Sequence, residues 1–250
     1  MSDKRKSAAP KTATSKYQPR PTSSRTTYVL GAVAAVVIVA LVIGGVVWNS
    51  HRNKGGGVDE AVLNQNASMI VGAASAPKTI DVFEDFMCPF CHQFEQQSGA
   101  AISKAVDDGQ LRVRYHMLTF LNPMSHSGDY SSRAAGAAQC VGAAESKDVF
   151  LKFHTALFEN QPEEHGSSDL SNADIAKIAA EQGASAATRK CIADGAKVAT
   201  ANTAAQQSLT QLAKALGGQA STPTVLLAGE PVNDIMNGPG WLDALLAKKS

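Results

Sequence analysis

The chain has 250 residues, of which 44% are hydrophobic and 18% charged, and its formal net charge is +1. Seven cations and one acid give residues 1–27 a net charge of +6, which leaves −5 for residues 28–250. Opposite charges in two parts of a chain indicate different environments. Residues 1–27 contain almost no large apolar side chain, so we predict a disordered basic tail. The apolar segment that follows explains this charge better than nucleic-acid binding does, so we expect no nucleic-acid partner.

An uncharged apolar run, YVLGAVAAVVIVALVIGGVVW, occupies residues 28–48. As a helix it would be roughly 31 Å long, which matches the hydrocarbon core of a bilayer. A cleaved signal peptide is the alternative, but its apolar core is shorter and ends in a small-residue cleavage site, which WNSHRNK does not supply. We therefore predict a single transmembrane anchor. Its N-terminus is expected in the cytoplasm, because the excess of Lys and Arg precedes the span.

The remainder of the chain is then expected outside the cytoplasm. Residues 49–60 include three consecutive glycines and are predicted to form a flexible linker. Residues 61–250 are enough for one domain with a single core. Outside the cytoplasm thiols are not held reduced, so the four cysteines of the chain are expected to pair.

Strands and helices alternate in this domain before and after a long helical block. Pro89 suits the first turn of a helix and Gly109 its end, and Ser171 with Asp174 predicts a capping box. Mixed strands with a helical block between them predict an α/β domain with an inserted α-helical subdomain. The predicted elements are a strand at 79–86, a helix at 88–109, a strand at 111–120, a long Ala-rich helical stretch after it, helices at 146–160 and 171–183, one or two helices at 193–218, a strand and turn at 222–232, and a helix at 240–249.

Cys88 and Cys91 are separated only by Pro89 and Phe90, where the first strand gives way to a helix. The free amides and positive dipole end of a helix stabilise a thiolate, so Cys88 is expected to be an exposed nucleophile with a lowered pKa. Cys91 lies one turn later on the same face and can close a disulfide with Cys88. Phe90, between the two sulfurs, can tune the stability of the thiolate.

A zinc site and an inert disulfide are the alternatives for this pair. Zinc sites usually need four ligands, but Cys140 and Cys191 form no second close pair, and no two histidines are three to five residues apart. We therefore predict no metal site. A purely structural disulfide across so short a loop would add little stability. The pattern favours a redox-active pair.

Three segments around these cysteines, at 70–72, 76–80 and 82–91, together with Thr-Pro-Thr-Val at 222–225, resemble the DsbA-type thioredoxin-fold oxidoreductases of bacteria, in particular the membrane-anchored ones. The resemblance covers about residues 68–250. It implies a thioredoxin fold in which residues 125–215 form the helical insertion.

The resemblance also implies roles for individual residues. Cys88 corresponds to the nucleophile, Cys91 to the resolving cysteine, and Thr222–Pro223 to a cis-proline loop that faces the substrate. Relatives often carry a buried acid six residues before the first cysteine, where this chain has Val82. Glu84 and Asp85 are close in sequence, but strand alternation is expected to point them elsewhere or only partly inward.

Cys140 and Cys191 both fall in the predicted insertion. We expect them to form a structural disulfide. A relay pair that passes electrons to Cys88 and Cys91 is the alternative, and it would need close approach of the two pairs.

The sequence thus predicts a membrane-tethered, extracytoplasmic oxidase that forms disulfides in unfolded or newly exported proteins and needs no cofactor of its own. The resemblance implies a quinone-linked membrane partner, of the DsbB or vitamin K epoxide reductase type, that reoxidises Cys88 and Cys91. A disulfide reductase or isomerase of the same fold and a non-catalytic redox or metal-binding module are the alternative functions.

Overall fold

The computed structural model describes residues 57–248. The predicted basic tail, the predicted anchor at 28–48 and most of the linker lie outside the described residues. Within residues 57–248, no helix combines the length and the apolar composition needed to cross a bilayer. The first described element is the short helix α2 (Glu60–Asn66), whose N-terminal amides donate to the Asp59 carboxylate.

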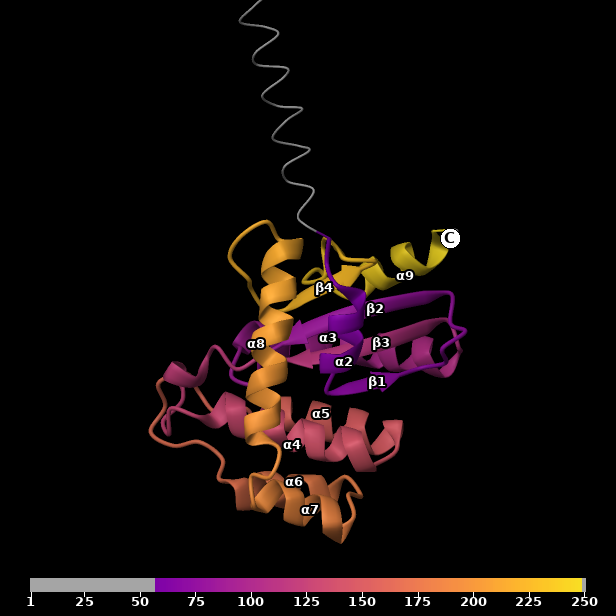
Figure 1. Cartoon of the computed structure of the whole chain (residues 1–250). Coiled ribbons are helices and arrows are strands. Elements are labelled where there is room, and N and C mark those ends of the chain that lie inside the picture. The colour runs from indigo at the N-terminus through magenta and orange to yellow at the C-terminus, as the bar shows by residue number, and fades with distance from the viewer. Residues whose placement is uncertain (1–56, 249–250) are drawn as a thin grey trace, which may run out of the picture. The chain divides into compact units, whose positions relative to one another are not determined.

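A mixed five-stranded sheet lies at the centre of the described part (Figure 1). In spatial order its strands are β1 (Met69–Val71), β3 (Leu111–Met117), β2 (Lys78–Glu84), β4 (Thr224–Leu227) and β5 (Glu230–Pro231). The central strand β2 is parallel to β3 and antiparallel to β4. Both edge strands are antiparallel to their neighbours. This arrangement places the end of β2 in the middle of the sheet, where α3 begins.

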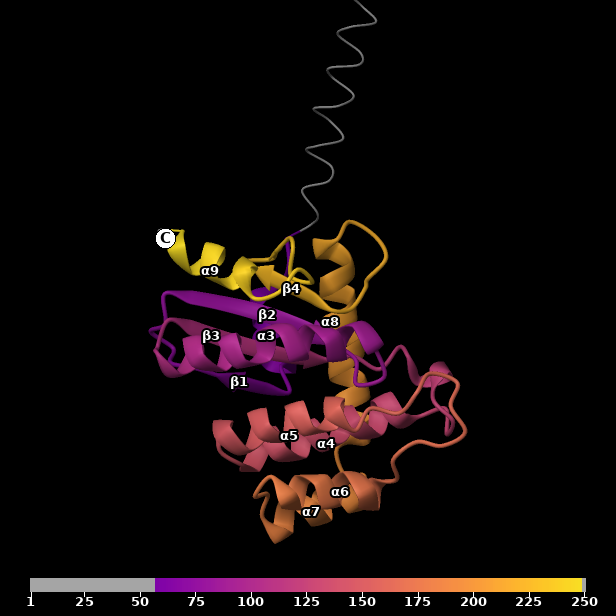
Figure 2. The ribbon, with the colours of Figure 1, turned by 180° about the vertical axis from the view of Figure 1, so that it is seen from behind.

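Helices cover both faces of the sheet. After α2 they are α3 (Pro89–Asp107), the 3-10 helix η1 (Asn122–Met124), α4 (Tyr130–Ala144), α5 (Lys147–Glu159), α6 (Asn172–Glu181), α7 (Ala186–Ala193), α8 (Val198–Ala215) and α9 (Gly240–Ala247). Helices α2 and α8 lie in front of the strands in Figure 1, and α3 lies in front of them in the reverse view of Figure 2. The indole of Trp241 in α9 donates to Ser98 of α3 at 3.0 Å, so α9 packs on the α3 face.

Strand β2 is buried on both faces. Because side chains alternate along a strand, Val82 and Glu84 face α3, whereas Asp81 and Phe83 face α2 and α8. Phe83 packs in a cluster with apolar residues of α2 and α8, and Val82 belongs to the larger core on the α3 side. All four side chains are fully buried, which requires a partner for each of the two acids.

The block from α4 to α8 is inserted between β3 and β4. A disulfide between Cys140 and Cys191 joins α4 to α7 across a sequence separation of 51 residues. Closing a loop of this length stabilises a fold by roughly 4 kcal/mol in the chain-entropy account. The insertion is therefore held together covalently as well as by its apolar contacts.

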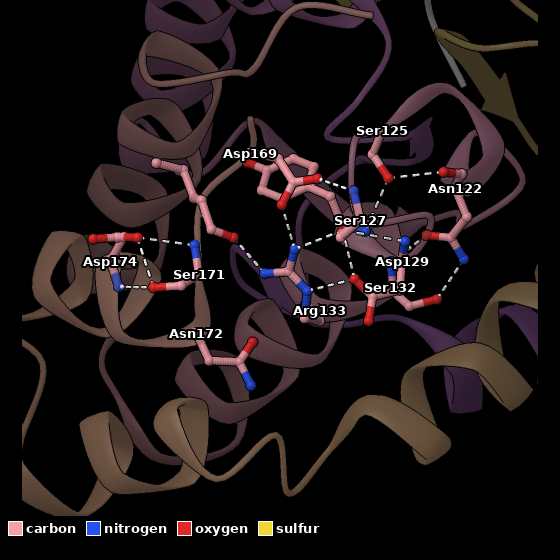
Figure 3. Close-up of polar contacts among 12 residues, drawn as sticks. Asn122, Ser125, Ser127, Asp129, Ser132, Arg133, Asp169, Ser171, Asn172 and Asp174 are labelled. Atoms are coloured by element: carbon pink, nitrogen blue, oxygen red, sulfur yellow. Dashed lines mark hydrogen bonds and ion pairs between the residues drawn. The ribbon is translucent and has the colours of Figure 1, made fainter. Parts of the chain in front are cut away.

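Arg133, at the start of α4, fastens two loops of the insertion to each other (Figure 3). Its guanidinium donates at 2.7 Å to Asp129 and at 2.7 Å to Asp169, and it also donates to the Leu170 carbonyl. The amide of Ser127 donates to the same Asp169 carboxylate at 2.7 Å. The segment after α5 is thus tied to the loop that leads from β3 into α4.

The α/β architecture with a helical insertion agrees with the sequence prediction, and the capping box of Ser171 and Asp174 is confirmed. The elements differ in several places. Strand β2 ends at Glu84 rather than at residue 86, because Asp85 turns the chain toward α3, and strand β3 ends at Met117 rather than at residue 120. Helices α2 and α7 and strand β1 were not predicted, since all three are short and lack a clear period. Gly195, with a φ of 62°, separates α7 from α8.

Candidate active site

Cys88 is the residue that caps the N-terminus of α3. Its amide donates to the Asp85 carbonyl at 2.9 Å, and Pro89 occupies the first helical turn, where a missing amide proton costs nothing. The amide of Cys91 donates to the Cys88 carbonyl at 3.1 Å. The Cys88 sulfur therefore lies at the end of the helix where unpaired amides and the dipole favour a negative charge.

The two thiols are both free and differ in exposure. Cys88 keeps 5% of its surface exposed and Cys91 none, whereas Phe90 between them is 63% exposed. Cys91 is thus the deeper sulfur, as the sequence predicts, but Cys88 is less open than expected.

That loop brings Thr222 and Pro223 to the cysteines. The Thr222–Pro223 peptide bond is cis. The Cys88 sulfur lies 3.6 Å from the Thr222 carbonyl oxygen, close enough for a thiol hydrogen bond. Residues 134 positions apart in the chain thus form one site.

The local environment gives the two thiols opposite acidities. A hydrogen bond from the Cys91 thiol is the main reason why the pKa of Cys88 is lowered from 9.0 to about 6. Burial opposes this shift, and hydrogen bonds with Thr222 and with the amides of Cys91 and Phe90 support it. Burial, the hydrogen bond to Cys88 and the nearby charge of Glu84 raise the pKa of Cys91 well above 9.0. Near neutral pH the reduced pair therefore holds a thiolate at Cys88 and a thiol at Cys91.

Glu84 does not point away from the site, contrary to the expectation from strand alternation. It shares the α3 face with Val82, is fully buried, and acts on Cys91 through its charge. The expectation was wrong because helices cover both faces of β2, so neither face is the outward one. Burial and the charge of Glu95, opposed by His154, raise the pKa of Glu84 to about 7.

Asp85 is also fully buried, so the expectation that its side chain points elsewhere or only partly inward was wrong as well. Its carboxylate accepts from the amide of Met87 at 3.0 Å and from the amide of Leu121 at 3.1 Å. Burial, partly offset by these hydrogen bonds and one from Ser131, raises its pKa to about 6. Asp85 therefore shapes the turn before Cys88 and holds the loop after β3 beside it.

Two residues of the site come from the inserted helices and were missed from the sequence. His154 of α5 bonds Glu84 through Nε2 at 2.9 Å, and Gln161, just after α5, donates to the carbonyls of Phe86 and Cys88 at 2.9 and 3.0 Å. Although burial opposes it, the charges of Glu95 and Glu84 raise the pKa of His154 to about 10. The only signal in the sequence was a histidine on the apolar face of a helix, a pattern that more often marks a core position.

The described residues leave two large apolar side chains exposed, Phe90 and Phe120, at 63% and 39%. Both are connected to the turn before Cys88. Phe90 lies inside the Cys-Pro-Phe-Cys motif, and Phe120 directly precedes Leu121, whose amide bonds Asp85. Phe90 supplies apolar surface within the motif itself, and Phe120 supplies it on the loop that Asp85 holds.

The acidity of Cys88 can be measured on the reduced protein by its rate of alkylation as a function of pH. Only the thiolate reacts, so the rate should rise with a midpoint of about pH 6. Because the folded pKa lies below the unfolded one, the thiolate stabilises the reduced fold fully above pH 9.0, and this contribution is lost as the pH falls through about 6. A midpoint near the ordinary value of 9.0 would contradict the geometry described here.

Comparison with known proteins identifies the family of the domain. A family profile described as "Thioredoxin" matches residues 64–245. The serine/threonine-protein kinase PknE of Mycobacterium tuberculosis is 39% identical over 192 residues, which cover 76% of this chain and 33% of the kinase. The chain therefore spans about one third of the length of the curated relatives that it matches first.

Solved structures from Mycobacterium tuberculosis are similar over most of their length. The reduced form of the disulfide bond oxidoreductase DsbG has a TM-score of 0.61 and 31% identity, over 73% of this chain and 86% of that one. Reduced DsbA has a TM-score of 0.56 and 30% identity, over 72% of this chain and 97% of that one. With its two cysteines at the start of α3 and a cis-proline loop beside them, the chain belongs to the thioredoxin family and, within it, to the DsbA-like thiol-disulfide oxidoreductases.

Proposed function

We propose that the chain is an oxidase that forms disulfide bonds in unfolded or newly exported proteins through Cys88 and Cys91. The observation that carries the proposal is the asymmetry of the two thiols, with the pKa of Cys88 lowered to about 6 and that of Cys91 raised. A stabilised Cys88 thiolate stabilises the reduced form of the pair. Its disulfide is then a stronger oxidant, because reduction releases more free energy.

In the proposed reaction, a client thiolate attacks the Cys88 sulfur of the Cys88–Cys91 disulfide. A mixed disulfide forms at Cys88, and Cys91 leaves as a thiolate and takes up a proton. A second client thiolate then attacks the client sulfur of the mixed disulfide, and Cys88 leaves as the stabilised thiolate. The client loses two electrons and gains one disulfide, while the pair takes up the two electrons.

Glu84 is the group placed to exchange the proton of Cys91. It is buried beside that thiol, and its pKa of about 7 lets it donate or accept a proton near neutral pH. Cys91 leaves as a poor, strongly basic thiolate, so protonation by Glu84 favours the first step. In the reverse direction Glu84 accepts the proton when Cys91 attacks a mixed disulfide.

Phe90 and Phe120 make an unfolded, apolar polypeptide the best-fitting client class. Folded proteins bury their large apolar side chains, so exposed aromatic surface beside Cys88 favours segments that are not yet folded. Contacts of this kind are weak and not sequence-specific, which suits an enzyme that must release many different products.

The oxidase function can be tested with the oxidised full-length chain and a reduced peptide that contains two cysteines. We expect formation of the peptide disulfide and its loss in Cys88→Ala, because Cys91 is then left without its partner and Cys140 stays bonded to Cys191. The Cys140→Ser/Cys191→Ser variant is the control for an electron relay and should stay active at a temperature where it is folded. Peptide oxidation by Cys88→Ala would refute the assignment.

The reduction potential of the Cys88–Cys91 pair separates the oxidase from the reductase or isomerase alternative. Oxidases of this kind lie near about −120 mV and reductants near about −270 mV. A value at the reducing end would favour the alternative.

The role of Glu84 predicts a slow proton-transfer step in Glu84→Gln, which keeps the shape of the side chain but cannot exchange a proton. Release of glutathione from a mixed disulfide at Cys88 should slow by roughly a hundredfold at neutral pH, since Cys91 must lose its proton to attack. The pH midpoint for Cys88 alkylation should stay at about 6 in the same variant. Unchanged release would remove Glu84 from the reaction.

For localisation we propose a single-pass protein of the cell membrane, with the N-terminus in the cytoplasm and the active site outside. The uncharged run at 28–48 and the cations before it support this topology. A quinone-linked membrane protein of the DsbB or vitamin K epoxide reductase type is the proposed reoxidising partner, because each turnover leaves two electrons on Cys88 and Cys91.

After mild reduction of intact cells, a membrane-impermeant maleimide should label the wild-type chain at Cys88. The Cys88→Ala variant should remain unlabelled, because Cys91 is buried and Cys140 is bonded to Cys191. Labelling that requires cell lysis would place the site on the cytoplasmic side and overturn the topology.

A further inference from the structure

His154 lies between two buried carboxylates, and its two ring nitrogens meet them differently. Nε2 is 2.9 Å from an oxygen of Glu84, which is a normal hydrogen bond. Nδ1 is 3.5 Å from Oε2 of Glu95, which is too long for one. The three residues are at most 7% exposed.

Two polar atoms on the Glu95 side of this cluster have no hydrogen-bond partner within the described part of the chain. They are Nδ1 of His154 and Oε1 of Glu95. A buried polar atom without a hydrogen-bond partner is unfavourable, so two of them on neighbouring side chains of an ion pair need a physical reason. On the opposite face of the sheet, His116 bonds Asp81 and Ser208 through its two nitrogens and leaves neither unpaired.

The spacing of these atoms is that of two ligands of one metal ion. Bonds of about 2.0–2.2 Å to nitrogen and oxygen, at a tetrahedral angle, separate two ligand atoms by about 3.4 Å. The observed 3.5 Å between Nδ1 and Oε2 fits this separation. The Nε2 contact to Glu84 matches the carboxylate–histidine–metal arrangement, in which the second ring nitrogen is oriented by an acid.

We propose that Glu95 and His154 form a binding site for a divalent transition-metal ion, for which Zn²⁺ is the best fit to one imidazole and one carboxylate. Nδ1 of His154, after release of its proton, and the two oxygens of Glu95 are the protein ligands, and Glu84 orients the imidazole from behind. The ligands do not include the Cys88–Cys91 thiols, although Glu84 also acts on Cys91, and metal binding does not rest on the proposed oxidase function. Glu84, Glu95 and His154 can present ligand atoms within 4.8 Å of one another.

An ion has a route to this site. Glu95 lines a cavity of about 620 Å³ between α3 and α5, whose other walls include Gln96, Ser103 and Thr155. The open coordination positions of the metal would face this cavity and take water or a small ligand. Neither His154 nor Glu84 lines the cavity, so the ion would meet Glu95 first.

Because Gly99 has no side chain, it provides room for the Glu95 carboxylate. A Cβ at this position would lie 2.8 Å from Oε2 of Glu95. Glycine inside a helix costs about 1 kcal/mol relative to alanine, so its presence in α3 is consistent with a demand for this space. An alanine here would displace the flexible end of Glu95 rather than the backbone.

The test is calorimetric titration of the oxidised full-length chain with Zn²⁺ alone, since oxidation removes the thiolates that would otherwise bind the metal. We expect one saturable site, weakened at least about tenfold in Glu95→Gln. Gly99→Ala should weaken it similarly while the helical circular dichroism is retained. Glu159→Gln is the matched control, because Glu159 is an exposed acid on the wall of the same cavity, and its affinity should stay within about twofold of wild type.

The Co²⁺-loaded oxidised chain should show ligand-field bands without a thiolate charge-transfer band. Absence of saturable binding, or equal affinity in Glu95→Gln and Glu159→Gln, would refute the site and leave His154 as an imidazolium held between two carboxylates. None of these measurements depends on turnover, so the outcome is independent of whether the chain proves to be an oxidase.

Discussion

The way in which β2 ends determines the chemistry of the site. Glu84 is the last residue of the central strand, Asp85 turns the chain, and Cys88 caps α3 three residues later. Asp85 fixes this turn by accepting two backbone amides, so the Cys88 sulfur is held at the end of the helix. This placement adds the amides of Phe90 and Cys91 to the hydrogen bond from the Cys91 thiol that chiefly lowers the pKa of Cys88.

Strand β2 and the residue that follows it carry three fully buried acids, and each is compensated in a different way. Asp81 faces α2 and α8 and is paired with Arg114 at 2.6–2.7 Å and with His116 at 2.8 Å. Asp85 relies on backbone amides and Glu84 on His154. Buried charge is tolerated only with such partners. The weakly compensated acids, Glu84 and Asp85, are the ones next to the cysteines, and their raised pKa values follow from that position.

Local sequence predicted the parts of the site that lie in one segment. The spacing of Cys88 and Cys91, Pro89 after the strand and the general order of elements were readable from residue types. The position of Thr222 beside Cys88 came only from a family resemblance, since the two are 134 residues apart. Glu84 and His154 could not be assigned from the sequence. Their roles depend on which helix covers which face of β2, and alternation says nothing about that when both faces are buried.

The inserted helices take part in the site and do not merely cover it. Helix α5 supplies His154 to Glu84, and the residue Gln161 that follows it holds the carbonyls of Phe86 and Cys88. A thioredoxin domain without the insertion would leave Glu84 buried without a partner, and its pKa would rise further because the opposing effect of His154 would be lost. Since the charge of Glu84 raises the pKa of Cys91, the seating of α5 against α3 sets the acidity of the resolving thiol. The Arg133 network and the Cys140–Cys191 disulfide, both within the insertion, tie its loops and helices to one another.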